Sequence, residues 1–326
     1  MASFNNGPVD AVRKRKRPME KVAIIGTGLI GRAWAMVFAR AGWNVVLQDP
    51  VAGVAAAAVA LIGQGLDDLR IQGLVDDPAA ALARVSVAQT LAQALHGVTF
   101  VQENGPETLA AKLAIYAELD RLAPLGVVLA SSTSAIVASS FTEKLAGRER
   151  CLVGHPVNPP HLVPIVEICG APWTSPDALA RAHAVYDSIG QVPISVKREI
   201  DSFILNRLQG ALLAEAFKLV GEGYVSPQDL DKTIKDGLGL RWAFMGPFET
   251  IELNAPGGIE DYCRRYGRGL KQIAANPATP EVFDAANVAC VAAAWGPALA
   301  QGAQADKMRW RDVRLAALVA HKKSQA

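Results

Sequence analysis

Three glycines are spaced as a phosphate-binding turn requires. They form a G-x-G-x-x-G pattern between an apolar run at residues 22–25 and a helix-like run. The first glycine permits a tight turn, the second lets the backbone approach a pyrophosphate, and the third lets strand and helix pack closely. The helix N-terminus also presents free N–H groups to phosphate oxygens. The pattern predicts a dinucleotide site whose candidate contacts are Gly26, Gly28, Leu29, Ile30 and Gly31.

An acidic residue after the next strand-like run indicates which dinucleotide is bound. Asp49 follows residues 44–48 and stands eighteen positions beyond Gly31, where a carboxylate can accept hydrogen bonds from a ribose 2′-hydroxyl. An NADP site usually carries an arginine near this point, whereas Pro50 and Val51 supply no cation. NAD is therefore the expected cofactor.

A histidine and a glutamate supply a candidate proton-transfer pair. His155 precedes a proline-stiffened loop, and Glu167 lies in an apolar strand-like run, where an unpaired carboxylate would be costly. A carboxylate on one ring nitrogen fixes the tautomer and stabilises the imidazolium that forms when the other nitrogen takes a proton. This pair suits alcohol oxidation beside NAD, with His155 as the base. From spacing alone, a structural histidine with Glu167 paired to Arg or Lys is an equal alternative.

Three further polar groups stand where a substrate group could be bound. The hydroxyls of residues 131–134 follow a strand-like run, although such residues are also typical of caps and turns. Asn206 and Arg207 interrupt an apolar helical stretch, where capping or solvent exposure is the alternative. Arg241 lies in a glycine-punctuated segment and has the geometry to clamp a carboxylate, although stacking on Trp242 explains it equally well.

The composition bounds the class of protein. The chain has 326 residues, of which 51% are hydrophobic and 20% charged, enough for a substantial core and two domains. The formal net charge of +2 gives little reason to expect nucleic acid or an anionic membrane as a partner. Most of the excess lies in the run 13–17, within a segment, residues 1–18, that we expect to be a disordered basic leader.

The chain carries no sign of membrane insertion or of a metal site. No run approaches the roughly 20 apolar residues that span a bilayer, and the N-terminus lacks a signal-peptide core, so a cytoplasmic location is expected. The cysteines are widely scattered, which favours neither a disulfide framework nor metal binding. We expect all four to be small buried hydrophobic residues: Cys151, Cys169, Cys263 and Cys290.

The elements that must position these residues follow from periodicity. From residue 19 to 199, short β-branched runs alternate with helical stretches, which predicts an α/β fold with a Rossmann-type doubly wound, mainly parallel sheet. Ligands sit outside the carboxyl ends of the strands in such sheets. Beyond the two runs that flank the glycine turn, the predicted strands are 98–102, 127–130, 151–154, 164–168 and 192–196.

The pattern of apolar residues changes after residue 200. Strand-like runs disappear, and apolar residues fall on a helical pattern from Phe203 to Val220. Ser226 and Pro227 then supply an N-cap and a first-turn proline for the next helix. Residues 200–326 are therefore predicted to form an all-helical C-terminal domain for substrate binding and dimerisation, whose apolar first helix is suited to a homodimer interface.

Taken in order, several of these segments resemble the 3-hydroxyacyl-CoA dehydrogenase superfamily. The likeness is greatest to its λ-crystallin branch, which includes L-gulonate 3-dehydrogenase. It extends from about residue 21 to residue 270, and the tail beyond matches poorly. The segments that carry it are 26–31, 131–134, 154–160, 200–208 and 236–241.

The resemblance implies NAD-dependent oxidation of an L-3-hydroxy group. It assigns the catalytic histidine to His155 and its paired glutamate to Glu167. Ser134 and Asn206 match the residues that hydrogen-bond the reacting oxygen. Glu103 matches a position near the nicotinamide ribose, and Ser134 joins it among the cofactor contacts.

Two departures from the fatty-acid enzymes point to a small free acid as substrate. Residues 156–160 follow the histidine in place of an aromatic pair, and Arg241 occupies the glycine-rich segment, as in the λ-crystallin branch. A guanidinium suits a free carboxylate better than a neutral thioester. A small L-3-hydroxy acid such as L-gulonate is expected. The alternatives are an L-3-hydroxyacyl-CoA dehydrogenase, a reductase of β-keto or diketo esters, and a crystallin-like NAD-binding protein without turnover.

Overall fold

The computed structural model describes residues 20–325, so the basic run 13–17 lies outside the described residues. The contacts divide the chain into two compact units. The first unit contains the residues up to Ile204 together with those from Lys307 onward, and the second contains Leu205–Asp306. The division between Ile204 and Leu205 lies close to the expected boundary at 199/200. The residues from Lys307 onward, which the sequence assigns to the helical domain, group with the first unit instead.

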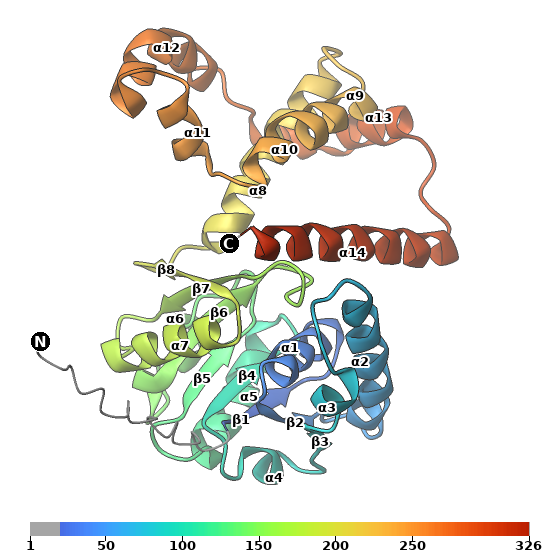
Figure 1. The fold of residues 1–326 in the computed structure, drawn as a ribbon. Coiled ribbons are helices and arrows are strands. Elements are labelled where there is room, and N and C mark those ends of the chain that lie inside the picture. Colours follow the sequence, from blue (N-terminus) through green and yellow to red (C-terminus); the bar gives the residue numbers. More distant parts are fainter. Residues whose placement is uncertain (1–19, 326) are drawn as a thin grey trace, which may run out of the picture. The chain divides into compact units, whose positions relative to one another are not determined.

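The first unit is built on one eight-stranded sheet (Figure 1). The strand order is β3-β2-β1-β4-β5-β6-β7-β8, and every neighbouring pair is parallel except β6 and β7. The expected mainly parallel sheet is thus confirmed. Its strands are β1 Lys21–Ile25, β2 Asn44–Gln48, β3 Val85–Val87, β4 Phe100–Glu103, β5 Val128–Ser131, β6 Cys151–Pro156, β7 Ile165–Gly170 and β8 Val192–Val196.

Helices cover both faces of this sheet, which makes the fold doubly wound. One apolar cluster joins the sheet to α1, α2, α3, α7 and the end of α14, and the other joins it to α4, α5 and α6. Because both faces are covered, the strands can be continuous apolar runs. The helices of this unit are α1 Leu29–Arg40, α2 Val54–Ile71, α3 Pro78–Leu82, α4 Leu91–Leu95, α5 Leu109–Leu122, α6 Ser139–Thr142 and α7 Pro176–Ser188, with a 3₁₀ turn η1 at Arg148–Arg150.

The second unit is all-helical, as the sequence predicts. Ser226 caps α9 by accepting a hydrogen bond from the backbone N–H of Asp229, and Pro227 occupies the first turn. The α8 and α14 helices each contain residues of both units. The helices from this point are α8 Phe203–Gly221, α9 Pro227–Lys232, a π-helical turn η2 Thr233–Leu238, α10 Gly239–Trp242, α11 Pro247–Leu253, α12 Gly258–Ala274, a 3₁₀ turn η3 Pro280–Phe283, α13 Ala285–Trp295 and α14 Gln301–Ser324.

The cysteine prediction is half correct. Cys151 on β6 and Cys169 on β7 are buried, and burial raises the pKa of each thiol to about 12. Cys263 and Cys290, on α12 and α13, are exposed instead. Helical periodicity places a residue on one side of its helix but does not say whether another element covers that side, which is why the expectation failed there.

No helix within residues 20–325 combines the length and the apolar character needed to cross a bilayer.

One half-buried histidine links the stability of the first unit to pH. His161 lies between β6 and β7, and its carbonyl oxygen accepts a hydrogen bond from Nη1 of Arg40, 2.9 Å away. Its Nδ1 atom is buried and, within the described residues, has no hydrogen-bond partner. Burial, aided by the charges of Arg40 and Arg311, lowers its pKa from 6.5 to about 4. The ring is therefore neutral in the folded protein at neutral pH.

We expect acidification from pH 6.5 to pH 4 to destabilise the protein through this group. The unfolded chain binds a proton at His161 near pH 6.5, whereas the folded protein binds it only near pH 4, so stability present above pH 6.5 is lost as the pH falls. The loss across this window is about 3 kcal/mol. Urea unfolding of the wild type and of His161→Gln at several pH values tests this. Equal pH dependence of the unfolding free energy in both proteins would contradict it.

Candidate functional site

The glycine turn between β1 and α1 has the geometry that a bound pyrophosphate needs. Gly26 adopts a φ of +84°, and a Cβ atom on it would lie 2.8 Å from the carbonyl oxygen of Asn104. A Cβ atom on Gly31 would lie 2.0 Å from the carbonyl oxygen of Gly26. A Cβ atom on Gly28 would meet nothing within 4 Å. Gly26 and Gly31 are therefore required by the fold itself, and Gly28 leaves open space beside the backbone.

The N-terminus of α1 is suited to an anion. Gly28 is its N-cap, and no side chain caps the first-turn N–H groups, which include those of Ile30 and Gly31. Such a helix end attracts phosphate oxygens through these donors and the helix dipole. Leu29 begins the helix, and its side chain is 49% exposed.

Asp49 follows β2 and is tied to the same turn. Its Oδ2 atom accepts hydrogen bonds from the backbone N–H of Thr27 at 2.8 Å and from the Thr27 hydroxyl at 3.1 Å. Its Oδ1 atom accepts from the N–H of Val51 at 3.0 Å. Each carboxylate oxygen has room for more than one donor, so an oriented Asp49 fits the diol of a ribose. The glycines and Asp49 together fit a dinucleotide.

His155 and Glu167 form a buried pair in the β6–β7 ladder. The two residues are direct partners in this antiparallel pairing. Nδ1 of His155 lies 2.7 Å from Oε2 of Glu167, whose side chain has no exposed surface. Oε1 of Glu167 accepts a hydrogen bond from the N–H of Ile204 at 2.8 Å, and the Phe203 ring stacks at 5.3 Å from the imidazole. These contacts fix both the tautomer and the orientation of His155.

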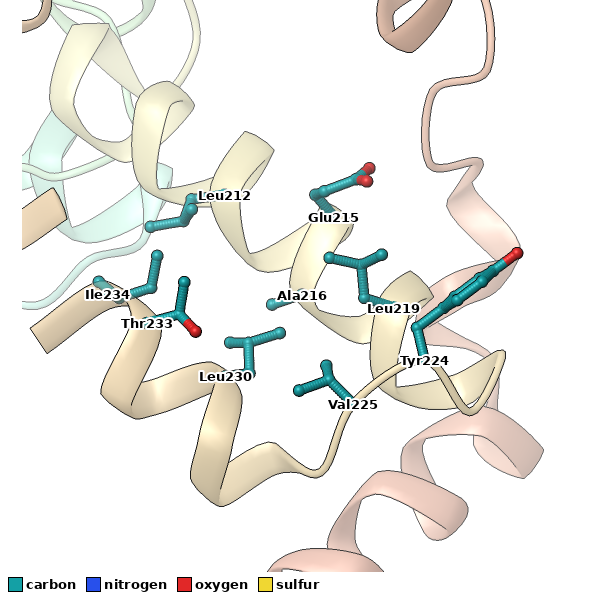
Figure 2. A pocket seen from close by; sticks show the side chains of 9 residues that line it. All are labelled: Leu212, Glu215, Ala216, Leu219, Tyr224, Val225, Leu230, Thr233 and Ile234. Atoms are coloured by element: carbon teal, nitrogen blue, oxygen red, sulfur yellow. The ribbon is translucent and has the colours of Figure 1, made fainter. Parts of the chain in front are cut away.

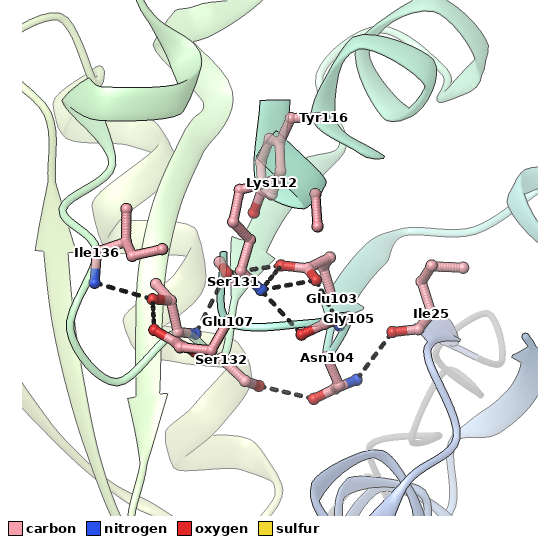
Figure 3. A network of polar contacts seen from close by, with 12 residues as sticks. Ile25, Glu103, Asn104, Gly105, Glu107, Lys112, Tyr116, Ser131, Ser132 and Ile136 are labelled. Carbon is pink, nitrogen blue, oxygen red and sulfur yellow. Dashed lines mark hydrogen bonds and ion pairs between the residues drawn. The ribbon is translucent and has the colours of Figure 1, made fainter. Parts of the chain in front are cut away.

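Ser134 lies in the turn after β5, among the hydroxyls that the sequence singles out. Oε1 of Glu107 accepts hydrogen bonds from the N–H groups of Ser134 and Ala135, at 3.0 Å and 3.1 Å, and from the Thr133 hydroxyl. Thr133 Oγ1 in turn accepts from the N–H of Ile136 at 3.0 Å (Figure 3). This turn therefore has a defined conformation.

Glu103 is buried among hydrogen-bond donors of the protein. Both carboxylate oxygens lie 2.8 Å from Nζ of Lys112, and neither side chain is more than 1% exposed. Glu103 also accepts hydrogen bonds from the Ser131 hydroxyl at 2.6 Å and from the N–H of Gly105 at 2.5 Å. These protein donors offset the burial of the carboxylate. The contact of Glu103 with the nicotinamide ribose stays a prediction.

The two remaining candidates belong to the second unit. Asn206 lies in the first turn of α8, one residue past the division between the units. Arg241 lies on α10, where it and the neighbouring Trp242 are exposed. The π-helical turn η2 precedes them, and such turns often mark functional segments.

The sequence did not point to a second polar network, which joins the glycine turn to the turn after β5. The Ser132 hydroxyl accepts hydrogen bonds from Nε1 of Trp34 and Nε2 of Gln102, at 3.0 Å and 2.8 Å, and donates to Oδ1 of Asn104 at 2.7 Å. Nδ2 of Asn104 donates to the carbonyl oxygens of Ile25 and Gln102. The only sequence signal was the position of Ser132 and Asn104 directly after two strands.

Comparisons with known proteins agree with this architecture. Residues 21–200 match the family model of the 3-hydroxyacyl-CoA dehydrogenase NAD binding domain, and residues 203–294 match that of the 3-hydroxyacyl-CoA dehydrogenase C-terminal domain. Lambda-crystallin of Oryctolagus cuniculus is 44% identical over 255 residues, which cover 77% of this chain and 80% of the relative. L-carnitine dehydrogenase of Streptomyces coelicolor is 37% identical over 287 residues, 86% of this chain and 90% of the relative.

A solved structure extends the likeness to nearly the whole chain. The structure of 5-formyl-3-hydroxy-2-methylpyridine 4-carboxylic acid 5-dehydrogenase, described as an NAD⁺-dependent dismutase, aligns with a TM-score of 0.79 at 26% identity. The alignment covers 92% of this chain and 97% of that chain. The glycine turn, Asp49 and both matched domains fit NAD as the cofactor. The chain belongs to the 3-hydroxyacyl-CoA dehydrogenase family, whose members are NAD-dependent dehydrogenases of 3-hydroxy compounds.

Proposed function

We propose that this protein oxidises the L-3-hydroxy group of a small hydroxy acid with NAD, and that His155 is the general base. The observation that carries the proposal is the 2.7 Å contact between Nδ1 of His155 and the fully buried Glu167 carboxylate. Because Nδ1 is held by the carboxylate, Nε2 is the nitrogen that takes the hydroxyl proton. NAD, when bound, would supply the hydride acceptor for the carbon that carries the hydroxyl group.

Ser134 and Asn206 are proposed to hydrogen-bond the reacting oxygen. A hydroxyl and an amide can donate to an oxygen whose negative charge grows as its proton leaves. In the reverse direction His155 returns the proton to the carbonyl oxygen. Support for Ser134 comes from the Glu107 contacts that fix its backbone, and support for Asn206 from its place in the family's pattern.

A free carboxylate is the proposed second anchor point of the substrate. L-carnitine, on which a relative at 37% identity acts, is itself a 3-hydroxy acid with a free carboxylate, and L-gulonate has the same arrangement. Arg241 is proposed to bind that carboxylate, because guanidinium and carboxylate form bidentate, charge-assisted hydrogen bonds. The thioester group of an acyl-coenzyme A and the ester group of a keto ester are both neutral.

Replacing Arg241 with Met is expected to weaken binding of a free hydroxy acid by about 1.5–3 kcal/mol, the scale for losing hydrogen bonds to a charged group, and to leave a keto ester nearly unaffected. The measurement is KM and kcat for L-gulonate oxidation and for reduction of ethyl acetoacetate by NADH. An equal loss on both substrates would contradict the carboxylate role.

A substrate panel followed by NADH absorbance tests the proposed reaction. The panel contains L-gulonate, L-carnitine, L-3-hydroxybutyrate and its coenzyme A thioester, together with ethyl acetoacetate and NADH in the reverse direction. Turnover is expected with a free acid and not with the thioester. Preference for the thioester or the ester would favour the acyl-CoA dehydrogenase or reductase alternatives. NADH binding without any turnover would favour the crystallin-like alternative.

We further propose a homodimer formed through the helical unit. The α8 helix carries exposed apolar side chains, including Leu208 at 67% and Leu213 at 42%. Between α8 and α9 lies a cavity of about 280 Å³ with an almost wholly apolar lining (Figure 2). Exposed apolar side chains of this kind are common at subunit interfaces. The molar mass in solution, from light scattering, decides between a monomer and a dimer.

A further inference from the structure

The turn that carries Ser134 has no secondary structure of its own. Residues 132–138 connect β5 to α6 and belong to neither helix nor strand. Backbone N–H groups in such a segment need acceptors from elsewhere, because an unpaired donor away from water costs free energy. The position of the Ser134 hydroxyl therefore depends on the side chain that accepts hydrogen bonds from the N–H groups of this turn.

A single carboxylate oxygen supplies them. Oε1 of Glu107 accepts hydrogen bonds from the N–H groups of Ser134 and Ala135 and from the Thr133 hydroxyl. Thr133 is completely buried, and its hydroxyl oxygen also accepts from the N–H of Ile136. Hydrogen bonds to an ionised acceptor are about twice as strong as neutral ones. Four consecutive residues of the turn are thus held, directly or through Thr133, by Glu107.

The backbone on both sides of Glu107 is held by hydrogen bonds. It lies between the end of β4 and the start of α5, where the Thr108 hydroxyl caps the helix by accepting a hydrogen bond from the N–H of Ala111. The preceding backbone is fixed by Lys112, whose Nζ donates to the carbonyl oxygen of Gly105 at 3.3 Å as well as to Glu103. Figure 3 shows this cluster beside the Glu107 contacts.

We propose that Glu107 is a positioning residue that holds the Ser134 hydroxyl where the reacting oxygen of the substrate needs it. The proposal rests on the proposed function, in which Ser134 binds that oxygen. Glu107 acts through the turn and takes no part in proton transfer. Because all three contacts converge on one oxygen, the amide oxygen of a glutamine can accept the same hydrogen bonds, whereas alanine removes all of them.

The test compares Glu107→Ala and Glu107→Gln in the full-length protein, using the panel member that the wild type turns over fastest. Glu107→Ala is expected to lower kcat between about tenfold and a hundredfold, the scale for misplacing a reacting group by about 1 Å. KM and the NADH dissociation constant should change less than about threefold. Glu107→Gln is expected to restore kcat to within about threefold of wild type. In Glu107→Ala, hydrogen exchange at the Ser134 and Ala135 amides should become faster.

Two further variants separate the proposal from its alternatives. Glu118→Ala removes another exposed carboxylate, on α5, which forms an ion pair with Arg121 of the same helix, and it should leave kcat and the amide exchange unchanged. Ser134→Ala should lower kcat at least as much as Glu107→Ala does.

If Ser134→Ala lowers kcat and Glu107→Ala does not, Glu107 has no positioning role. If Ser134→Ala has no effect, or no panel member is turned over, the proposed function fails and the positioning role fails with it. Equal losses of kcat in Glu107→Ala and Glu107→Gln would also overturn the proposal.

Discussion

Replacing His155 with Gln is expected to lower kcat about a thousandfold while leaving the NADH dissociation constant within about twofold of wild type. A positioned general base contributes about 10²- to 10⁴-fold to the rate. Glutamine has similar size and polarity but cannot take a proton at neutral pH. Since the glycine turn and Asp49 lie on β1, α1 and β2, away from the β6–β7 ladder in the strand order, cofactor binding should survive. Steady-state kinetics and NADH fluorescence titration measure the two quantities.

Two variants control for this result. His161→Gln removes another imidazole from the segment that follows β6, and it should leave kcat near the wild-type value at pH 7.5. Glu167→Gln should lower kcat about a hundredfold or more, because an amide can donate to Nδ1 and so favour the tautomer whose Nε2 already carries a proton. Loss of NADH binding in His155→Gln, or kcat within tenfold of wild type, would mean that His155 is a structural residue.

Gly28→Ala is expected to lose NADH affinity alone, and Gly31→Ala is expected to lose both stability and NADH affinity. In Gly28→Ala the new methyl group meets no protein atom within 4 Å, so the fold should be retained, but the methyl occupies the space that a pyrophosphate needs. NADH affinity should fall at least about a hundredfold with little change in the melting temperature. In Gly31→Ala the methyl would lie 2.0 Å from the carbonyl oxygen of Gly26. Backbone cannot yield as a flexible side chain does, so stability and binding should fall together.

Thermal unfolding and NADH titration on the same samples distinguish the two outcomes. Gly73→Ala, in the turn after α2, serves as a control for a glycine whose substitution strains the backbone without touching the site, since its φ is +70° and no atom lies within 4 Å of the added methyl. It should lower the melting temperature and leave NADH affinity unchanged. Wild-type affinity in Gly28→Ala would show that the cofactor does not approach this turn closely.

Local signals predicted the β-α-β unit that carries the glycine turn and Asp49, and with it NAD as the cofactor. The glycine spacing and Asp49 lie within 24 residues of one another, and the β-α-β unit that holds them is a continuous segment. The β8 strand was predicted at 192–196, residue for residue, because glycine and charged residues bound a short β-branched run there. The three-residue strand β3, Val85–Val87, was missed because so short a run shows no period.

The partners of the acidic residues could not be predicted, because they depend on contacts between distant segments. Spacing left Glu167 equally free to pair with His155 or with a cation, and the strand pairing places it beside His155. Glu103 and Glu107 are four residues apart and look alike in the sequence. One is enclosed with Lys112, and the other reaches a turn 26 to 28 residues further along the chain. No local pattern distinguishes these two environments.

The cross-strand position of His155 and Glu167 also makes turnover a measure of correct folding. Successive side chains of a strand point to opposite faces of the sheet, so a one-residue shift of β7 along β6 would carry Glu167 to the wrong face. Such a misfolded molecule would keep its helix and strand content and its glycine turn, and it would still bind NADH. The imidazole would lose its carboxylate. The ratio of active sites titrated by turnover to those titrated by NADH binding therefore reports the fraction of a preparation in which this antiparallel pair has formed in register.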